Sequence, residues 1–459
     1  MPNRREILKM VGNGFGMLGF AHLFGHSASA SGASNVKSPH FPPKAKQVIY
    51  LFLNGGPSQV DTFDPKPMLD KYHGKPMPSG NLQTERKTGN LLRSPFQFNR
   101  CGQSGIEVSE IFPQLGQRID DFCVVRSLHT DRPNHEPSLF RLNCGNPLPG
   151  HPSMGSWITY GLGSENQNLP GFVVLCPGLP VVGPQLWSSS FLPSGYQGTH
   201  IANNETDPEK LIQYLRNKSL RPEEQRRQID LLANLNRLQS RKPAEDPYLE
   251  SSLHAMEIAY HMQTEAMQAF DIRQESGATC ERYGDSDFGR GCLLARRLIE
   301  RGVRMVQVYF GAGQPWDNHE DILRHRTLAN QADRPIAALL EDLKALGLFS
   351  ETIVMIGGEF GRTPAVEVSG VVPVQNGRDH NNHGFSMLLA GGGIKGGMTY
   401  GATDDFGFKA VENPVTPNDI HATVLQLLGL DHTKLTFRYS GRDFRLTDVG
   451  GNVIREILA

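Results

Sequence analysis

Histidines and carboxylates in several short segments have the types and spacing needed to hold a metal ion. In the segment WDNH, Asp317 and His319 stand two residues apart, after an apolar run over 305–310. Carboxylate and imidazole together suit zinc, manganese or iron. Such a pair is more often ordinary polar surface, but its place after a predicted buried strand favours metal coordination. We therefore take both residues as candidate metal ligands.

The densest group of such residues is the segment GRDHNNHG at 377–384. From this segment we take His380 as a candidate catalytic residue and His383 as a candidate metal ligand. The alternative is a solvated polar loop. Arg378, together with Arg362 in the preceding segment, has the planar fork that binds a tetrahedral anion through two hydrogen bonds. These two arginines are the predicted binding residues for a sulfate or phosphate group.

Glu359 follows another apolar run, over 352–356, and has glycines close on either side. A carboxylate buried without a partner costs several kcal/mol, so Glu359 needs a metal, a cation or several N–H donors. We take it as a metal ligand. The alternative is a buried ion pair with Arg362.

Three further candidates lie earlier in the chain. Asn54 and Asp61 follow the first apolar run, over 48–53, at a Gly-Gly-Pro turn that lets a ligand approach the backbone closely. Both are taken as metal ligands, although this signal is weak on its own. His135 stands near the predicted start of a helix, where the helix dipole favours an anion, and is taken as catalytic. The alternative for His135 is a residue that merely flanks the helix cap.

The elements that must position these residues are short apolar runs bounded by Gly, Pro or charged residues, the pattern of parallel strands buried on both faces. Helical patterns lie between or after them. The predicted fold is α/β, a doubly wound, mostly parallel sheet, whose ligands bind beyond the carboxyl ends of the strands. The charged, helix-forming stretch from about 207 to 274 is predicted to be a helical insertion. The predicted strands cover 48–53, 122–125, 172–175, 305–310, 352–356 and 386–390, and the predicted helices 288–301, 330–346 and 419–428.

The first 30 residues have the three parts of a secretory peptide. Arg4 and Arg5 precede Leu8-Lys9, a Gly-rich apolar stretch follows, and Ala28-Ser29-Ala30 offers a cleavage site. The arginine pair resembles the twin-arginine (Tat) consensus. We expect a signal peptide over 1–30, a linker over 31–46, a single domain over 47–459, and a periplasmic or secreted protein without stable membrane insertion after leader removal.

Composition excludes several classes of function. Lys plus Arg is 46 against 47 for Asp plus Glu, a net charge of -1, so no overall field draws the chain onto nucleic acid. The six cysteines lie far apart without CxxC pairs, which excludes a zinc knuckle or a thioredoxin-like site. They are read as buried apolar residues, although export would permit a disulfide.

The residues above, in this order, resemble the domain-of-unknown-function family 1501, a set of Tat-exported proteins related to sulfatases. The resemblance covers nearly all of the chain after the leader and rests on FLNGGPSQVDTFDPKP, HPSMGSWITYGLGSENQNLPGFVVL, WDNH, GEFGRTP, GRDHNNHGFSMLLAGGGIKGGMTYGATDDFG and LTFRYSGRDFRLTDV. It implies the alkaline phosphatase and sulfatase superfamily fold, with one or two metals at the carboxyl edge of the sheet.

The same resemblance implies departures from sulfatase chemistry. Asn54 stands where the superfamily has a metal-binding aspartate, and Glu359-Phe360 replaces an Asp-His pair. His135 stands at the nucleophile position, so no formylglycine can form there, and His135 would serve as a metal ligand or a proton carrier. One metal set has counterparts in Asp317, His319 and His383, which would leave an open position for water.

The resulting prediction is an exported, metal-dependent hydrolase of sulfate or phosphate esters that uses zinc, calcium or manganese and direct attack by water. Its substrate would be a sulfated or phosphorylated small molecule or polysaccharide. The alternative is a non-catalytic relative that binds an anionic glycan or a cell-surface partner. The hydrolase prediction requires Asp317, Glu359, His135 and His383 to surround a single cation.

Overall fold

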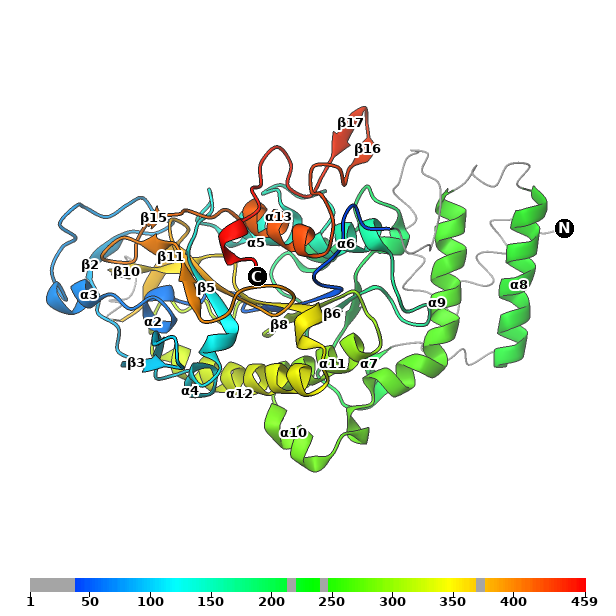
Figure 1. The fold of residues 1–459 in the computed structure, drawn as a ribbon, viewed down its shortest axis with the longest axis horizontal. Coiled ribbons are helices and arrows are strands. Elements are labelled where there is room, and N and C mark those ends of the chain that lie inside the picture. Colours follow the sequence, from blue (N-terminus) through cyan, green and yellow to red (C-terminus); the bar gives the residue numbers. More distant parts are fainter. Residues whose placement is uncertain (1–37, 213–219, 240–246, 369–375) are drawn as a thin grey trace.

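The computed structural model describes residues 38–212, 220–239, 247–368 and 376–459 (Figure 1). The predicted signal peptide and the first part of the predicted linker lie outside these residues. Among the described residues, no helix has both the length and the apolar character needed to cross a membrane. All six cysteines are described and carry free thiols.

The centre of the molecule is an eight-stranded sheet with the order β13-β5-β12-β9-β1-β8-β6-β7. Neighbouring strands pair in parallel, except that β12 is antiparallel to both β9 and β5. The strands are β1 (Gln47–Phe52), β5 (Phe122–Leu128), β6 (Phe172–Leu175), β7 (Thr199–Ile201), β8 (Met305–Tyr309), β9 (Thr352–Gly357), β12 (Phe385–Ala390) and β13 (Met398–Tyr400). The mostly parallel α/β sheet is thereby confirmed.

The predicted strand over 386–390 has the opposite direction to the prediction. A parallel neighbour to β9 would need a crossover connection. Instead the chain after β9 forms β10 (Gly361–Glu367) and β11 (Arg378–Asn381), two antiparallel strands of a small sheet completed by β2 (Thr88–Leu91). It then re-enters the main sheet from the carboxyl edge, so β12 runs backwards.

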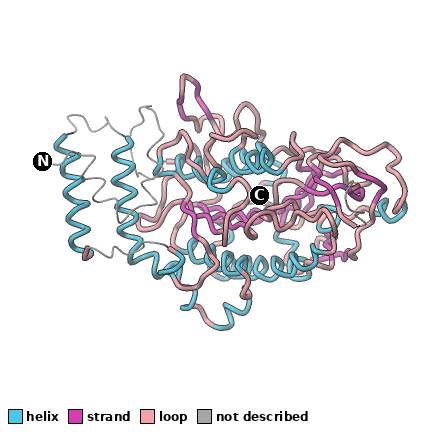
Figure 2. Tube along the Cα trace, turned by 180° about the vertical axis from the view of Figure 1, so that it is seen from behind, coloured by secondary structure: helices cyan, strands magenta, loops and turns pink. Residues whose placement is uncertain are grey.

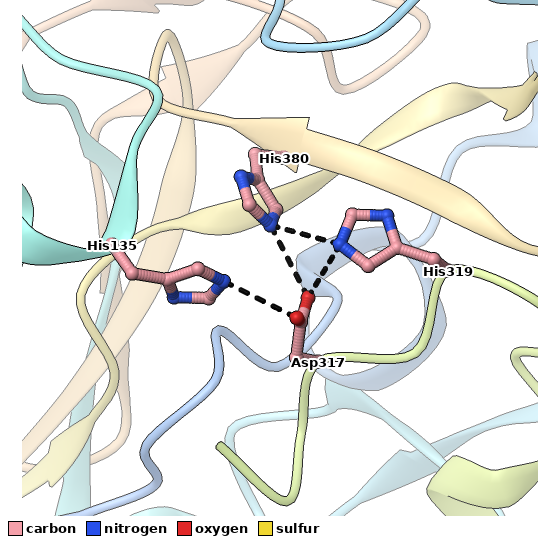
Figure 3. A group of neighbouring side chains, drawn as sticks. All are labelled: His135, Asp317, His319 and His380. Carbon is pink, nitrogen blue, oxygen red and sulfur yellow. Dashed lines mark hydrogen bonds and ion pairs between the residues drawn. The ribbon is translucent and has the colours of Figure 1, made fainter. Parts of the chain in front are cut away.

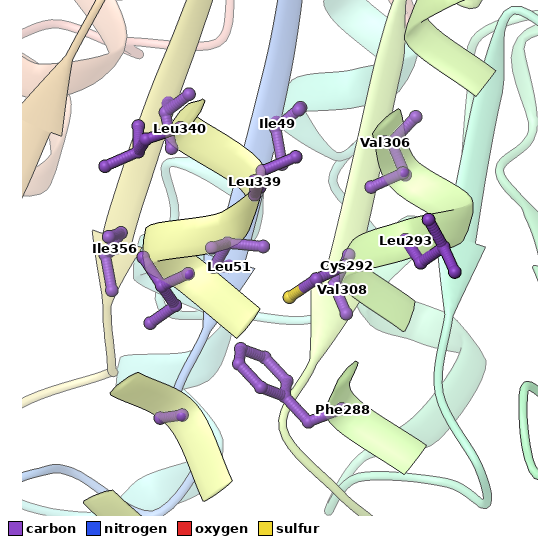
Figure 4. Close-up of a cluster of buried hydrophobic side chains, with 14 of the residues drawn as sticks. Ile49, Leu51, Phe288, Cys292, Leu293, Val306, Val308, Leu339, Leu340 and Ile356 are labelled. Atoms are coloured by element: carbon purple, nitrogen blue, oxygen red, sulfur yellow. The ribbon is translucent and has the colours of Figure 1, made fainter. Parts of the chain in front are cut away.

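Helices cover both faces of the sheet, because both faces of the central strands are apolar. In β1, Ile49 and Leu51 belong to one core cluster, while Val48, Tyr50 and Phe52 belong to the other. The first cluster packs against α11 (Asp287–Glu300) and α12 (Arg324–Ala345), as Figure 4 shows. The second packs against α5 (His135–Cys144), α6 (Met154–Leu162) and α13 (Pro417–Leu427). The three layers are visible in Figures 1 and 2.

In the stretch predicted as a helical insertion, the described residues form three α-helices, α7 (Pro208–Leu211), α8 (Pro222–Gln239) and α9 (Pro247–Phe270). Met262, Ala266, Ala269 and Phe270 of α9 join the core, and α8 packs against α9 at the end of the molecule (Figure 1). The shorter elements are α2 (Gln59–Thr62), α3 (Pro67–Lys71), α4 (Pro113–Gly116), α10 (Gly277–Tyr283), β3 (Phe98–Cys101), β4 (Ile106–Ser109), β14 (Ala402–Thr403), β15 (Ala410–Glu412), β16 (Phe437–Tyr439) and β17 (Arg442–Phe444).

Candidate metal centre

The carboxyl ends of the parallel strands carry most of the predicted site residues. His135 is the first residue of α5, seven residues after β5 ends, and Glu359 comes two residues after β9. Asp317 and His319 lie in the loop after β8. His380 comes from β11 of the small sheet, where it pairs with Arg362 of β10. Four chain segments far apart in sequence therefore meet at one edge.

One glycine permits this meeting. Gly55 has a φ of 113°, and a Cβ atom there would lie 2.5 Å from the main-chain nitrogen of Asp317. Only a residue without a side chain allows the turn after β1 to touch the loop that carries Asp317.

Three imidazoles converge on one carboxylate in this centre (Figure 3). Nε2 of His319 lies 2.7 Å and Nε2 of His380 3.2 Å from Oδ1 of Asp317. Nε2 of His135 lies 3.4 Å from Oδ2 of the same carboxylate, within ion-pair range. The nitrogens of His319 and His380 are 3.1 Å apart. These four side chains each offer one donor atom, and all four atoms lie within 4.8 Å of one another.

The far nitrogen of each ring is held by an oxygen. Nδ1 of His135 lies 2.7 Å from Oε1 of Glu359. Nδ1 of His380 contacts the carbonyl oxygen of Pro133 at 2.8 Å and the carboxylate of Glu85, and Nδ1 of His319 contacts the carboxylate of Glu367.

These oxygens fix the tautomer of each neutral ring. A carbonyl or ionised carboxylate can only accept, so each Nδ1 carries the proton and each Nε2 turns a lone pair inward. This is the arrangement that orients metal-bound histidines in proteins.

The donor set fits a divalent metal. Nε2 of His135 is buried and makes no hydrogen bond. Two facing imidazole lone pairs repel each other unless a proton or a cation lies between them. Imidazole nitrogens and a carboxylate oxygen are ligand types that zinc takes, and a catalytic zinc keeps one coordination position for water beside its protein ligands.

The charges around the centre keep Asp317 ionised. Burial raises the pKa of Asp317, but its contacts with the imidazoles of His135, His319 and His380 and the charge of Arg362 outweigh burial and leave the pKa well below its usual range. For His135, burial lowers the pKa, but the nearby carboxylates Asp317 and Glu359 outweigh it and leave the pKa raised. The centre therefore attracts positive charge.

Both predicted anion-binding arginines have other partners. Arg362 is fully buried, and its guanidinium donates to Oδ1 of Asp317 at 2.6 Å and to the carbonyl oxygen of Gly56 at 2.9 Å. Arg378, also fully buried, donates to both carboxylate oxygens of Asp61 at 2.7 and 3.2 Å. The predicted anion-binding role of the two arginines is thereby corrected, since neither has a guanidinium edge open to substrate. The same ion pair removes Asp61 from the metal ligands.

Asn54 is likewise not a ligand. Its Nδ2 donates to the carbonyl oxygens of Gly311 and Gly313 at 2.9 and 2.6 Å, so it fastens the loop after β8 to the end of β1. Glu359 contacts the donor group only through His135. Both of its oxygens accept from the main-chain N–H of Gly55, at 3.0 and 3.2 Å, and Oε1 holds His135. The predicted roles of Asn54 and Glu359 as ligands are corrected to positioning roles, and the partner of Glu359 is His135 rather than Arg362.

His383 does not join the centre. Its Nε2 contacts the carbonyl oxygen of Gln83 at 2.9 Å, and its ring packs near Phe408. The physical reason is local. His380 lies on β11 and points across the small sheet to Asp317, whereas His383 lies in the turn beyond that strand. Of the two histidines in this segment, His380 therefore takes the place predicted for His383.

Sequence reasoning missed two carboxylates that hold the histidines. Glu367 is 1% exposed and lies at the end of β10. A charged residue at a buried strand position was a signal that it had a partner. Glu85 lies in an irregular segment before β2, where the sequence offers no comparable signal.

Comparison with known proteins places the whole described domain in one family model. The model described as "Protein of unknown function (DUF1501)" matches residues 45–458. None of the curated proteins matches this chain.

Similar solved structures include a lipoteichoic acid synthase, LtaP, from Listeria monocytogenes, with 10% identity, TM-score 0.35, and 95% of this chain and 80% of that one covered. The PsFucS1 sulfatase from Pseudoalteromonas sp. has 10% identity, TM-score 0.35, and coverage of 94% and 72%. A phosphonate monoester hydrolase, SpPMH, from Silicibacter pomeroyi has 13% identity, TM-score 0.35, and coverage of 76% and 71%. Similarities this distant say nothing about the activity of the present chain.

Proposed function

This chain belongs to the DUF1501 family of proteins of unknown function, and we propose that it is a metal-dependent hydrolase of sulfate or phosphate esters. One observation carries the proposal. Three histidines turn Nε2 toward the carboxylate of Asp317, and an oxygen atom holds each Nδ1.

The residues that would hold the ion are His135, Asp317, His319 and His380. A divalent ion bound there supplies a Lewis acid and lowers the pKa of nearby water toward neutrality. Three imidazoles favour zinc or manganese over calcium, because calcium prefers six to eight oxygen ligands.

The protein itself keeps the donors in place and leaves one side open. Glu359 and Glu367 hold the Nδ1 protons of two histidines, while Arg362 holds Oδ1 of Asp317. Asp317 is the most exposed of the four donors, at 20% of its side chain, so solvent reaches the centre most readily beside it.

Water rather than a side chain is the proposed attacking group. His135 stands where the sulfatase resemblance would place a nucleophile, and its Nδ1 is held by Glu359. The hydroxyl of Ser138, one turn further along α5, is buried and donates to the carbonyl oxygen of Arg132 at 2.8 Å. Neither group is free to form a covalent intermediate.

The test compares two histidines of one segment. We expect purified protein to bind about one equivalent of zinc or manganese and to hydrolyse p-nitrophenyl sulfate or p-nitrophenyl phosphate. His380→Ala should lose both metal and hydrolysis. His383→Ala, the matched control, should keep both, because its ring contacts Gln83 and Phe408. Metal-free protein, or equal losses in both variants, would refute the proposal.

One observation favours a second candidate, a non-catalytic protein that binds an anionic glycan or a cell-surface partner. The two arginines expected to bind the ester anion are fully buried and paired internally. This reading predicts that the protein hydrolyses neither the sulfate nor the phosphate ester, whether or not it holds metal.

We further propose that the protein is exported through the twin-arginine route, on the strength of Arg4, Arg5 and the apolar stretch after them. Replacing both arginines with lysine should keep the protein in the cytoplasm, as measured by cell fractionation. Unchanged export of that variant would contradict the proposal.

A further inference from the structure

A single loop before β2, residues 83–87, touches the outer side of the metal centre at several points. Its Glu85 carboxylate contacts Nδ1 of His380. The main-chain N–H of Arg86 donates to Oδ2 of Asp379 at 2.7 Å, and the carbonyl oxygen of Lys87 accepts from the main-chain N–H of Val368 at 2.7 Å. The position of this loop is therefore tied to the strand that carries His380 and to the end of β10.

The carboxylate of Glu367 links the guanidinium of Arg86 to His319 of the metal centre. Its Nη1 contacts Oε1 of Glu367 at 3.0 Å, and the other oxygen of Glu367 holds Nδ1 of His319. Glu367, His319 and Asp379 form a second group with metal-ligand spacing. The guanidinium of Arg86 supplies positive charge to that group through its contact to Glu367 alone, because the contact to Asp379 is made by the main-chain N–H of Arg86.

Arg86 differs from the two buried arginines in its free edge. Its side chain is 46% exposed, whereas those of Arg362 and Arg378 are fully buried. Within the described part of the chain, the guanidinium of Arg86 makes one hydrogen bond, from Nη1 to Glu367. Its Nε and Nη2 atoms make none to the described residues. Burial lowers the pKa of Arg86, but Glu367, Glu85 and Asp317 outweigh it and raise the pKa, so the group is a permanent cation.

We propose that Arg86 binds the tetrahedral anion of the substrate, the role that sequence reasoning assigned to Arg362 and Arg378. The proposal rests on the proposed function of the same site. Nη1 anchors the guanidinium to Glu367, and the parallel N–H groups of Nε and Nη2 present the two-pronged edge that matches two oxygens of a sulfate or phosphate group. A lysine has the charge but lacks this edge.

The experiment measures binding of inorganic phosphate and inorganic sulfate to the full chain by titration calorimetry, with and without zinc. Because a hydrogen bond to a charged group contributes about 1.5–3 kcal/mol, Arg86→Gln should weaken anion binding by about 10- to 100-fold. Arg86→Lys should recover part of the loss. Arg326→Gln is the matched control, since Arg326 is 51% exposed and paired with Glu110, and it should bind anions as the wild type does. A stronger effect on phosphate than on sulfate, or the reverse, identifies the preferred ester.

Zinc content separates failure of this inference from failure of the proposed function. If Arg86→Gln binds the anion as tightly as the wild type, the role of Arg86 is overturned and the hydrolase proposal stands. The same holds if the variant loses anion binding only because it has also lost zinc. A wild-type protein that binds neither anion also overturns it. A chain without metal refutes the hydrolase, and the zinc-free titrations then still decide whether Arg86 binds the anion.

Discussion

Replacing Glu359 with glutamine tests whether the carboxylates behind the histidines act through the metal. Glu359 is fully buried and holds Nδ1 of His135 at 2.7 Å, so glutamine keeps the shape and one acceptor but removes the charge. Loss of such a partner typically weakens metal binding by about 10- to 100-fold, which corresponds to about 1.4–2.8 kcal/mol. We expect a loss in this range for zinc, measured by competition with a chromophoric chelator.

The control is Asp61→Asn, which neutralises an equally buried carboxylate that pairs with Arg378 instead of a histidine. This change should lower the free energy of unfolding. It should leave zinc affinity within about twofold of the wild type, a far smaller change than the factor of ten that corresponds to about 1.4 kcal/mol. Equal zinc affinities in Glu359→Gln and the wild type would refute a positioning role for Glu359. So would an equal loss in the Asp61 variant, because the effect would then come from general destabilisation.

Other predictions concern packing, charge and pH. Gly377→Ala should abolish metal binding, because a Cβ atom there would lie 1.6 Å from the carbonyl oxygen of His319. Gly277→Ala should keep metal binding, because a Cβ atom at that position meets open space. Metal analysis of both variants checks this. Arg378→Gln should lower the free energy of unfolding in urea by about 3–5 kcal/mol, since it leaves a fully buried carboxylate unpaired; a change below about 1 kcal/mol would argue against a structural ion pair. Burial lowers the pKa of His421 from 6.5 to about 4, so the folded state holds it neutral. The neutral His421 should therefore contribute fully to the free energy of unfolding above pH 6.5. As the pH falls from 6.5 to 4, protonation of the unfolded chain should lower that free energy by about 3 kcal/mol, at about 1.36 kcal/mol per pKa unit. Urea unfolding at pH 7 and pH 4.5 measures this, and His421→Gln should remove that part of the pH dependence.

The strands could be predicted because both of their faces are buried. The runs at 48–53, 305–310 and 352–356 are apolar without alternation, which sets them apart from the half-exposed strands of an antiparallel sheet. The direction of β12 could not be predicted, since its sequence is equally apolar in either direction. What reverses it is the pair of strands β10 and β11 that precedes it.

The site was predictable to the level of the segment but not of the side chain. Asp317, His319 and His135 meet as the strand-end rule implies. The choice between His380 and His383 depends on where β11 ends, and strand boundaries are weakly encoded in sequence. A buried ion pair of Arg362 was weighed as an alternative, but its partner Asp317 escaped prediction, because that residue comes from a loop distant in the chain.

The four donors span residues 135 to 380, and this separation has a consequence for how the protein matures. No fragment that stops short of β11 contains the full set. Under the proposed function, tight binding of an ion therefore requires that nearly the whole polypeptide has been synthesised and has folded. A bound ion would then stabilise only the last stage of folding. At a free concentration one hundred times its Kd, it would add about 2.7 kcal/mol to the stability of the finished molecule and nothing to that of its unfinished precursors.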